Sequence, residues 1–378
     1  MRNDDGRSVG AAGFMPSFPM RLLAGSIVGG VCAVCAPLAV YSLSLAIFGL
    51  PHVLSELRYV DSRFGRRLDR VMVGRILGLL SVVVAIRAAT TFRILPGRVG
   101  LTAELAGVAA LALLCARDGA PARKALATGA GLILGVGAAL APFFTVILVS
   151  ILHNLTPLGF LWQIAPSDRR RSLMAGAAVA FLMMPLFIAS GLPRLAFSSF
   201  FGPPGGLDPL AAGPLENQLF VYVPPPFLTS IHSVDIFSAS VAAQIAHYGA
   251  VLVFLPWLLR QYDPSAKGLA PWPKGLAFAL VCLFAGALSL ARFGQGFSSA
   301  RALYGIAAAF HAWLEVPVLI LALTRGADQT TARPNRNDEA LATTDTAKAR
   351  SILNPAIQAI SAASNSMTHV SPTMTDGQ

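Results

Sequence analysis

Long apolar stretches alternate with short polar segments along most of the chain. A helix rises about 1.5 Å per residue, so about 20 apolar residues cross the hydrocarbon core of a membrane. The pattern therefore predicts an all-α, polytopic integral membrane bundle of about nine transmembrane helices, with eight as the alternative. The predicted spans are 24–49, 72–92, 99–116, 125–141, 142–164, 172–191, 234–259, 274–293 and 302–324.

Residues 125–164 decide between eight and nine spans, because they are nearly uncharged and would make one helix about 60 Å long. That length is too great for a single crossing, so we expect a tight hairpin near Gly137–Pro142. Nine spans place the basic clusters on one side, which the positive-inside rule assigns to the cytoplasm. The expected location is a bacterial inner membrane, with the N-terminus outside and the C-terminus cytoplasmic.

Composition agrees with a membrane protein. Hydrophobic residues make up 55% of the 378 positions and charged residues 12%, against roughly 25% charged in soluble domains. The mean hydropathy is +0.64. The net charge of +11 comes from short clusters between apolar runs, so we expect a lipid bilayer as the partner and no nucleic acid.

The domain organisation follows from the same pattern. Residues 1–23 are an N-terminal tail, and residues 24–324 form the transmembrane helical domain. Within it, residues 192–233 form an external loop rich in Pro, Gly and aromatic residues, which we expect to cap the bundle. The polar segment 325–378 shows little periodicity and predicts a disordered cytoplasmic tail.

Two His/Glu pairs share one spacing: His52 precedes Glu56 by four residues, and His311 precedes Glu315 by four. On a helix this spacing puts both side chains on one face. Ionisable groups surrounded by lipid are costly and mark functional sites. Glu56 and Glu315 are therefore candidate catalytic residues that orient ligands or handle protons, although Glu56 could instead form an interfacial ion pair with Arg58.

Four histidines are candidate metal ligands. His153, His247 and His311 lie about 11, 13 and 9 residues from the outer ends of their spans, so they share a depth within about 6 Å. His52 follows the first span as drawn. It enters the membrane only if that helix instead crosses from about Cys35 to Leu57 with a kink at Pro51.

The residues around these histidines suggest how ligands would be held. Glu315 could accept a hydrogen bond from a ligating imidazole, and Gln244 lies one turn before His247. Arg87 and Glu104, in adjacent spans, predict a structural ion pair. Imidazoles with one or two carboxylates and no thiolate cluster suit non-haem iron, copper or zinc, and we favour Fe²⁺ as the cofactor.

The run Gly49-Leu50-Pro51-His52 resembles the Brp/Blh family of bacterial membrane β-carotene cleavage dioxygenases, in which such a run precedes an iron-binding histidine. The resemblance implies a polyhelical fold, iron held by histidines from several helices, and oxidative cleavage of a carotenoid. It assigns only His52. The chain departs from the family after His52, where Val-Leu-Ser-Glu replaces a small-residue run leading to Asp, and it lacks the family's later paired histidines.

The predicted function is an intramembrane, iron-dependent oxygenase acting on a hydrophobic, carotenoid-like substrate that enters from the bilayer. Two other classes stay open. A membrane cytochrome could use the same histidines as axial haem ligands. A multi-pass transporter could use the His and Glu residues as a proton or metal relay.

Overall fold

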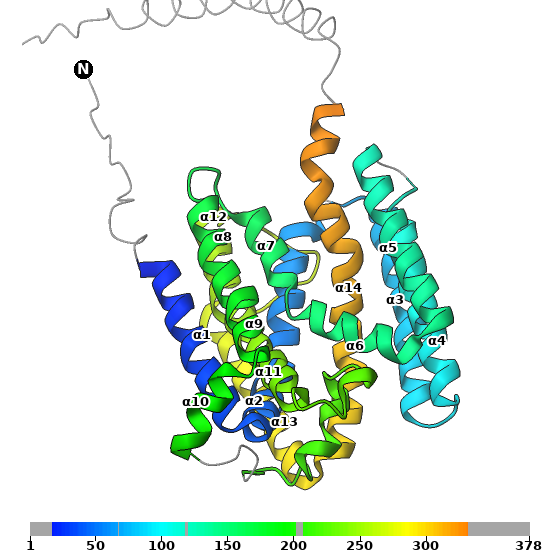
Figure 1. Cartoon of the computed structure of the whole chain (residues 1–378). Coiled ribbons are helices and arrows are strands. Elements are labelled where there is room, and N and C mark those ends of the chain that lie inside the picture. Colours follow the sequence, from blue (N-terminus) through cyan, green and yellow to red (C-terminus); the bar gives the residue numbers. More distant parts are fainter. Residues whose placement is uncertain (1–16, 67, 118–119, 202–206, 332–378) are drawn as a thin grey trace, which may run out of the picture. The chain divides into compact units, whose positions relative to one another are not determined.

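The computed structural model describes residues 17–66, 68–117, 120–201 and 207–331, and these form helices without strands (Figure 1). The described residues up to Arg325 form one compact unit, which contains the candidate site. The α-helices are α1 (Ser17–Cys35), α2 (Pro37–Val60), α3 (Arg70–Thr91), α4 (Gly97–Leu114), α5 (Pro121–Leu140), α6 (Pro142–His153), α7 (Thr156–Ile164), α8 (Arg170–Ala178), α9 (Met184–Ala189), α10 (Leu192–Phe201), α11 (Ser233–Gly249), α12 (Leu255–Tyr262), α13 (Gly275–Gln295) and α14 (Phe297–Thr331).

The chain is an all-α, multi-pass membrane protein. Among the described residues, nine helices are long and apolar enough to cross a membrane. Most begin and end within a few residues of the predicted spans; Arg70–Thr91 corresponds to 72–92, for example. A break lies at the place where the hairpin between the fourth and fifth spans was expected, since α5 ends at Leu140 and α6 begins at Pro142.

The first predicted span, 24–49, is wrong. The apolar run is divided at Ala36 between α1 and α2, and the second of these helices carries His52. Pro37 has no backbone N–H and restricts the residue before it, which is why Ala36 leaves helical geometry. The alternative crossing from about Cys35 to Leu57 is therefore close to the observed helix.

The segments at the chain ends also differ from expectation. α1 begins at Ser17, inside the predicted tail 1–23, and α14 continues to Thr331, past the predicted boundary at 325. The rest of the expected tails, residues 1–16 and 332–378, lies outside the described residues. Hydropathy marks where lipid contact ends and not where the backbone stops being helical, which explains both differences.

Proline shapes several of the crossings. π-Helical turns at Val179–Met183 and Ala250–Phe254 each come just before a proline, Pro185 and Pro256 respectively. Proline cannot donate a backbone hydrogen bond, so the preceding turn widens to restore bonding. Pro51 lies inside α2, where α13 covers it at Gly286; a Cβ on Gly286 would meet the Ile47 carbonyl oxygen at 2.7 Å.

The predicted external loop, 192–233, packs as a cap over one end of the bundle. After α10 it contains the 3₁₀ turns Leu215–Asn217, Leu219–Val221 and Pro225–Phe227. Leu215, Leu219 and other loop residues are buried with residues of α1, α2 and α11. The apolar residues of this segment therefore contribute to the buried core at this end of the bundle.

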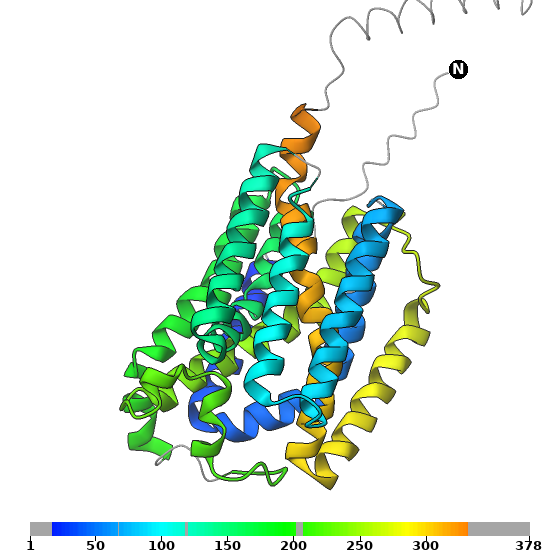
Figure 2. The same cartoon turned by 90° about the vertical axis from the view of Figure 1, so that its right-hand side faces the viewer.

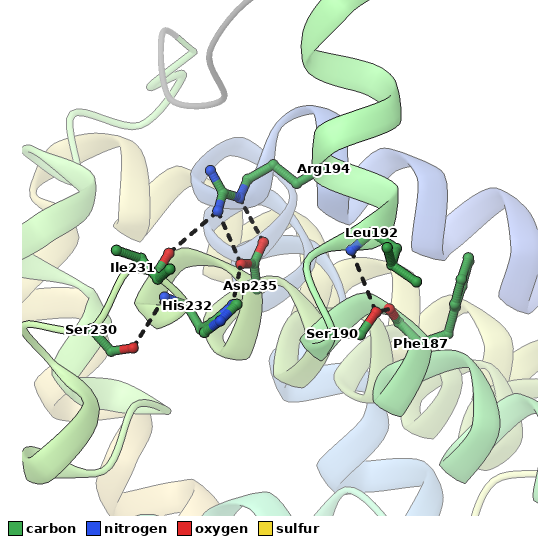
Figure 3. Close-up of polar contacts among 8 residues, drawn as sticks. All are labelled: Phe187, Ser190, Leu192, Arg194, Ser230, Ile231, His232 and Asp235. Atoms are coloured by element: carbon green, nitrogen blue, oxygen red, sulfur yellow. Dashed lines mark hydrogen bonds and ion pairs between the residues drawn. The ribbon is translucent and has the colours of Figure 1, made fainter.

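An ion pair ties the loop to α11 (Figure 3). The Arg194 guanidinium donates to Asp235 through Nε, at 2.6 Å, and through Nη2, at 3.1 Å. The buried carboxylate also lies 3.3 Å from Nδ1 of His232, which is half exposed. Gly191 makes the preceding turn with a φ of +79°, a conformation that favours glycine.

The start of α1 lies towards the end of the bundle opposite to the start of α14 (Figures 1 and 2). Basic residues gather at this end: Arg63 pairs with Asp263, and Arg66 donates to the Gly268 carbonyl. The start of α1 reaches this end because α1 and α2 run in opposite directions on the two sides of the break at Ala36.

Compartment-sensitive reporters test this arrangement. A reporter fused before Ser17 and one fused after Arg325 should report the same compartment, since α14 starts at the end of the bundle opposite to the start of α1. A reporter inserted in the α3–α4 turn, between Arg93 and Pro96, should report the other compartment. Opposite results from the two terminal fusions would contradict this arrangement.

Candidate metal centre

Four helices bring the predicted histidines and carboxyl groups together inside the bundle. α2 supplies His52 and Glu56, the end of α6 supplies His153, α11 supplies His247, and α14 supplies His311 and Glu315. Three of the imidazoles and both carboxyl groups are at most 2% exposed. The structure thus gathers all six candidate residues, including His52, which the depth argument had left apart.

His52 and His311 face each other across α2 and α14. Their Nε2 atoms are 3.1 Å apart, and their ring centroids are 4.8 Å apart. Nδ1 of His52 lies 3.2 Å from the Phe48 carbonyl and donates to it, which leaves Nε2 with its lone pair. A hydrogen bond from His311, or a cation between the two rings, would satisfy that lone pair.

His153 is held by Glu315. Its Nδ1 lies 2.6 Å from Glu315 Oε2, so Nε2 is left with its lone pair. This carboxylate–imidazole pairing is the arrangement that orients metal-ligating histidines in many proteins. The Thr156 hydroxyl lies 2.7 Å from both Glu315 Oε1 and the His153 carbonyl, where α6 gives way to α7. The break after His153 therefore also supports the carboxyl group.

His247 and Glu56 form the least satisfied part of the cluster. Glu56 Oε2 lies 3.6 Å from His247 Nε2, beyond hydrogen-bond distance. Both carboxyl oxygens and both ring nitrogens lack a hydrogen-bond partner among the described residues. Leaving a buried polar group unpaired costs about 1–3 kcal/mol. These four atoms are therefore available to bind a further polar group.

The donor set and spacing fit a metal ion. One ligand atom each from His52, His153 and His247 lies within 4.8 Å of the other two. Two nitrogens bound to one ion at about 2.1 Å would lie about 3.0–3.4 Å apart, so small side-chain movements would complete the site. Ring centroids of neighbouring histidines are 4.7–5.5 Å apart.

A cavity of about 310 Å³ adjoins the histidines. His52, His153 and His311 line one part of it. Much of the remaining wall is apolar or carries small side chains, and the residues responsible are Leu45, Val146, Val149, Gly305, Ala308, Ala309 and Ala312. Small residues on one face of α14 leave the space between this helix and α6.

A polar network lines the same cavity. The Tyr222 hydroxyl donates to Gln244 Oε1 at 2.7 Å, and Gln244 Nε2 donates to the Tyr248 hydroxyl at 3.1 Å and to Ser44. Gln244 thus binds tyrosines, whereas sequence reasoning placed it beside His247. Burial raises the pKa of Tyr222, a loop residue, well above its usual range, so its phenol stays protonated and donates.

Sequence reasoning missed the tyrosines. Tyr248 covers His52, with ring centroids 4.4 Å apart, and Tyr304 lines the cavity two turns before His311 on α14. The seven-residue spacing from Tyr304 to His311 puts both on one helix face, and this signal could have identified Tyr304. Gly49 makes room for the ring, since a Cβ there would lie 2.9 Å from Tyr304 Cε2.

The ion pair predicted between Arg87 and Glu104 is present. Arg87 Nη2 lies 2.8 Å from Glu104 Oε1, and the same oxygen accepts a hydrogen bond from Trp313 Nε1 at 2.6 Å. Trp313 lies between His311 and Glu315 in the sequence of α14. The pair therefore fixes α14 against α3 and α4 at the level of the histidines, which is a structural role.

Comparison of the chain with protein-family models, curated proteins and solved structures finds no match. The functional inference therefore depends on the geometry of the site and on the chemistry of its side chains.

The unpaired Glu56 carboxyl generates a stability prediction. In metal-stripped protein, Glu56→Met should stabilise the fold by about 1–3 kcal/mol, because it replaces a buried unpaired group with an apolar one of similar size. Thermal unfolding in detergent measures the effect. The neighbouring Ser55→Ala should lower stability, since it removes the hydrogen bond to the Val251 carbonyl. A loss of stability in Glu56→Met would show that the carboxyl already has a partner.

Proposed function

We propose that the cluster of His52, His153, His247 and His311 binds a single iron ion and that the protein is an intramembrane oxygenase of hydrophobic substrates. The observation that carries the proposal is the convergence of these imidazoles with unpaired buried nitrogens beside an apolar cavity. Iron bound by neutral imidazoles with an open coordination position would supply activation of dioxygen. The resemblance at Gly49–His52 makes a polyene such as a carotenoid the expected substrate.

The side chains have distinct roles in this proposal. Glu315 fixes the tautomer and the orientation of His153 through the hydrogen bond to Nδ1. The Phe48 carbonyl does the same for His52. Glu56 faces His247 without a hydrogen bond, so its carboxyl is free to bind the ion or to hold a proton near the substrate. Burial of the cluster keeps bulk water from the reacting groups.

The spacing of the rings favours a bare ion over haem. Two axial imidazoles on one haem iron would hold their ring centroids about 6 Å apart with the macrocycle between them. The observed centroid distances of 4.7–5.5 Å leave no room for a macrocycle between neighbouring rings. A transporter would need a polar path, whereas much of the wall of the adjoining cavity is apolar.

The end of the bundle that carries Arg63, Arg66 and the start of α8 is rich in arginine and faces the cytoplasm in this proposal. Since α1 starts towards this same end (Figure 1), the proposal puts the start of α1 on the cytoplasmic side, where the sequence had suggested an outer N-terminus, and the short apolar helix α1 then crosses in addition to the nine longer helices. The resemblance adds a bacterial plasma membrane as the expected location. The capping loop then covers the outer end of the bundle.

Metal analysis with a visible absorption spectrum tests the proposal on detergent-purified protein prepared without chelators. We expect about one iron per chain and no Soret band, because the donor set suits non-haem iron. Single replacements His52→Ala, His153→Ala, His247→Ala and His311→Ala should each abolish iron loading while the protein remains folded.

His232→Ala is the matched control, since His232 lies in the loop beside Asp235 and should leave iron loading unchanged. Retention of the metal in two of the four replacements would contradict a shared site. A Soret band would assign the protein to the cytochromes, and absence of any metal would leave a relay or structural role for the cluster.

The hydrogen bond between Glu315 and His153 predicts a partial loss of iron affinity when Glu315 is replaced. Glu315→Gln should keep the shape of the side chain but weaken its hold on Nδ1, lowering iron affinity about 10- to 100-fold. Competition with a calibrated chelator measures the change. Glu104→Gln is the control, because Glu104 contacts Arg87 and Trp313 instead of a histidine. An equal loss of affinity in both variants would mean that the effect of Glu315 is not specific.

A further inference from the structure

The polar wall of the cavity has more hydrogen-bond donors than the protein satisfies. Tyr248 and Tyr304 both line the cavity. The Tyr248 hydroxyl accepts a hydrogen bond from Gln244 Nε2 at 3.1 Å. A phenol that accepts a hydrogen bond keeps its own proton, so the hydroxyl of Tyr248 can still donate to a group in the cavity.

A second free donor lies across the cavity. The Asn154 side chain lines it and is only 3% exposed, yet its Nδ2 has no hydrogen-bond partner in the described part of the chain. Asn154, Tyr222, Tyr248 and Tyr304 all line this cavity, so their polar groups belong to one region. A buried N–H without an acceptor is unfavourable, and a ligand that supplies the acceptor would recover that cost.

We propose that this region binds the carbonyl oxygen of an otherwise apolar substrate. A carbonyl has two lone pairs and no proton, which suits one phenol proton and one amide N–H approaching from different walls. Tyr304 is seven residues from His311 on the same face of α14, about 10 Å along the helix. The oxygen held there sets which carbons of the substrate lie next to the histidines.

The volume and the walls determine what kind of molecule fits. A cavity of about 310 Å³ is at the lower end of the range of small-molecule sites, roughly 300–1,000 Å³. It therefore encloses one end of a long molecule, while the remainder extends between helices. The apolar and small residues on α6 and α14 accept the hydrocarbon part. This inference rests on the proposed function where it concerns the reaction of the bound substrate. Binding of the carbonyl oxygen itself requires no metal ion.

A matched pair of fluorescent polyenes tests the inference: all-trans-diphenylhexatriene, a hydrocarbon, and its acetyl derivative, a ketone. The purified full-length protein should bind the ketone more tightly. Replacing both phenols, Tyr248→Phe with Tyr304→Phe, should lower the preference for the ketone about three- to ten-fold, which is the effect of one net hydrogen bond. Affinity for the hydrocarbon should stay the same, since both rings are retained.

Tyr262→Phe is the matched control, because Tyr262 lies in α12 among residues of a separate buried cluster; it should keep the full preference. Equal binding of both probes by the unmodified protein, or a preference that survives the double replacement, would overturn the inference. Iron content is measured on the same samples. A ketone preference in protein without metal would support the binding inference and contradict the proposed oxygenase, so the two failures are distinguishable.

Discussion

A buried imidazole or carboxyl group in a lipid-surrounded bundle has no bulk water to pair with, so it must find its partner on another helix. The histidines and glutamates of α2, α6, α11 and α14 lie where these four helices meet. His52 reaches His311, and His153 reaches Glu315. Where this pairing is incomplete, at His247 and Glu56, the bundle keeps an unsatisfied polar centre. Unpaired polar groups of this kind reduce stability, and proteins retain them where function requires them.

Breaks in the helices decide where these groups lie. The break at Ala36 separates α1 from α2 and thereby moves His52 into the membrane. The break after His153 ends α6 at the cluster and brings Thr156 against Glu315. Proline produces both effects locally, through the missing N–H and the restriction on the preceding residue. The prolines that interrupt the membrane-spanning helices therefore also determine where the polar side chains of the cluster lie.

Small residues provide the space that the polar groups surround. The alanines and Gly305 on one face of α14 open the cavity, and Gly49 allows Tyr304 to lie against α2. Trp313, held by Glu104, keeps α14 in place next to this opening. One face of α14 thus packs against α4. Another face, which carries small residues, borders the cavity and can contact a ligand. The histidines and the tyrosines adjoin the same space and give it a part lined by imidazoles and a part lined by hydrogen-bonding groups.

The sequence by itself determined the class of protein, most of the crossings and the identity of the polar residues inside them, because length and hydropathy suffice to mark a span. It also determined that His311 and Glu315 share a face, since their spacing is local. It did not reveal the break at Ala36, because a single proline does not interrupt hydropathy. Only the tertiary structure decided that His52 joins the cluster, that His153 pairs with Glu315, and that Tyr222, Tyr248 and Tyr304 line one cavity. These are contacts between distant segments, and they depend on how each helix is rotated and packed, which the pattern along one chain does not specify.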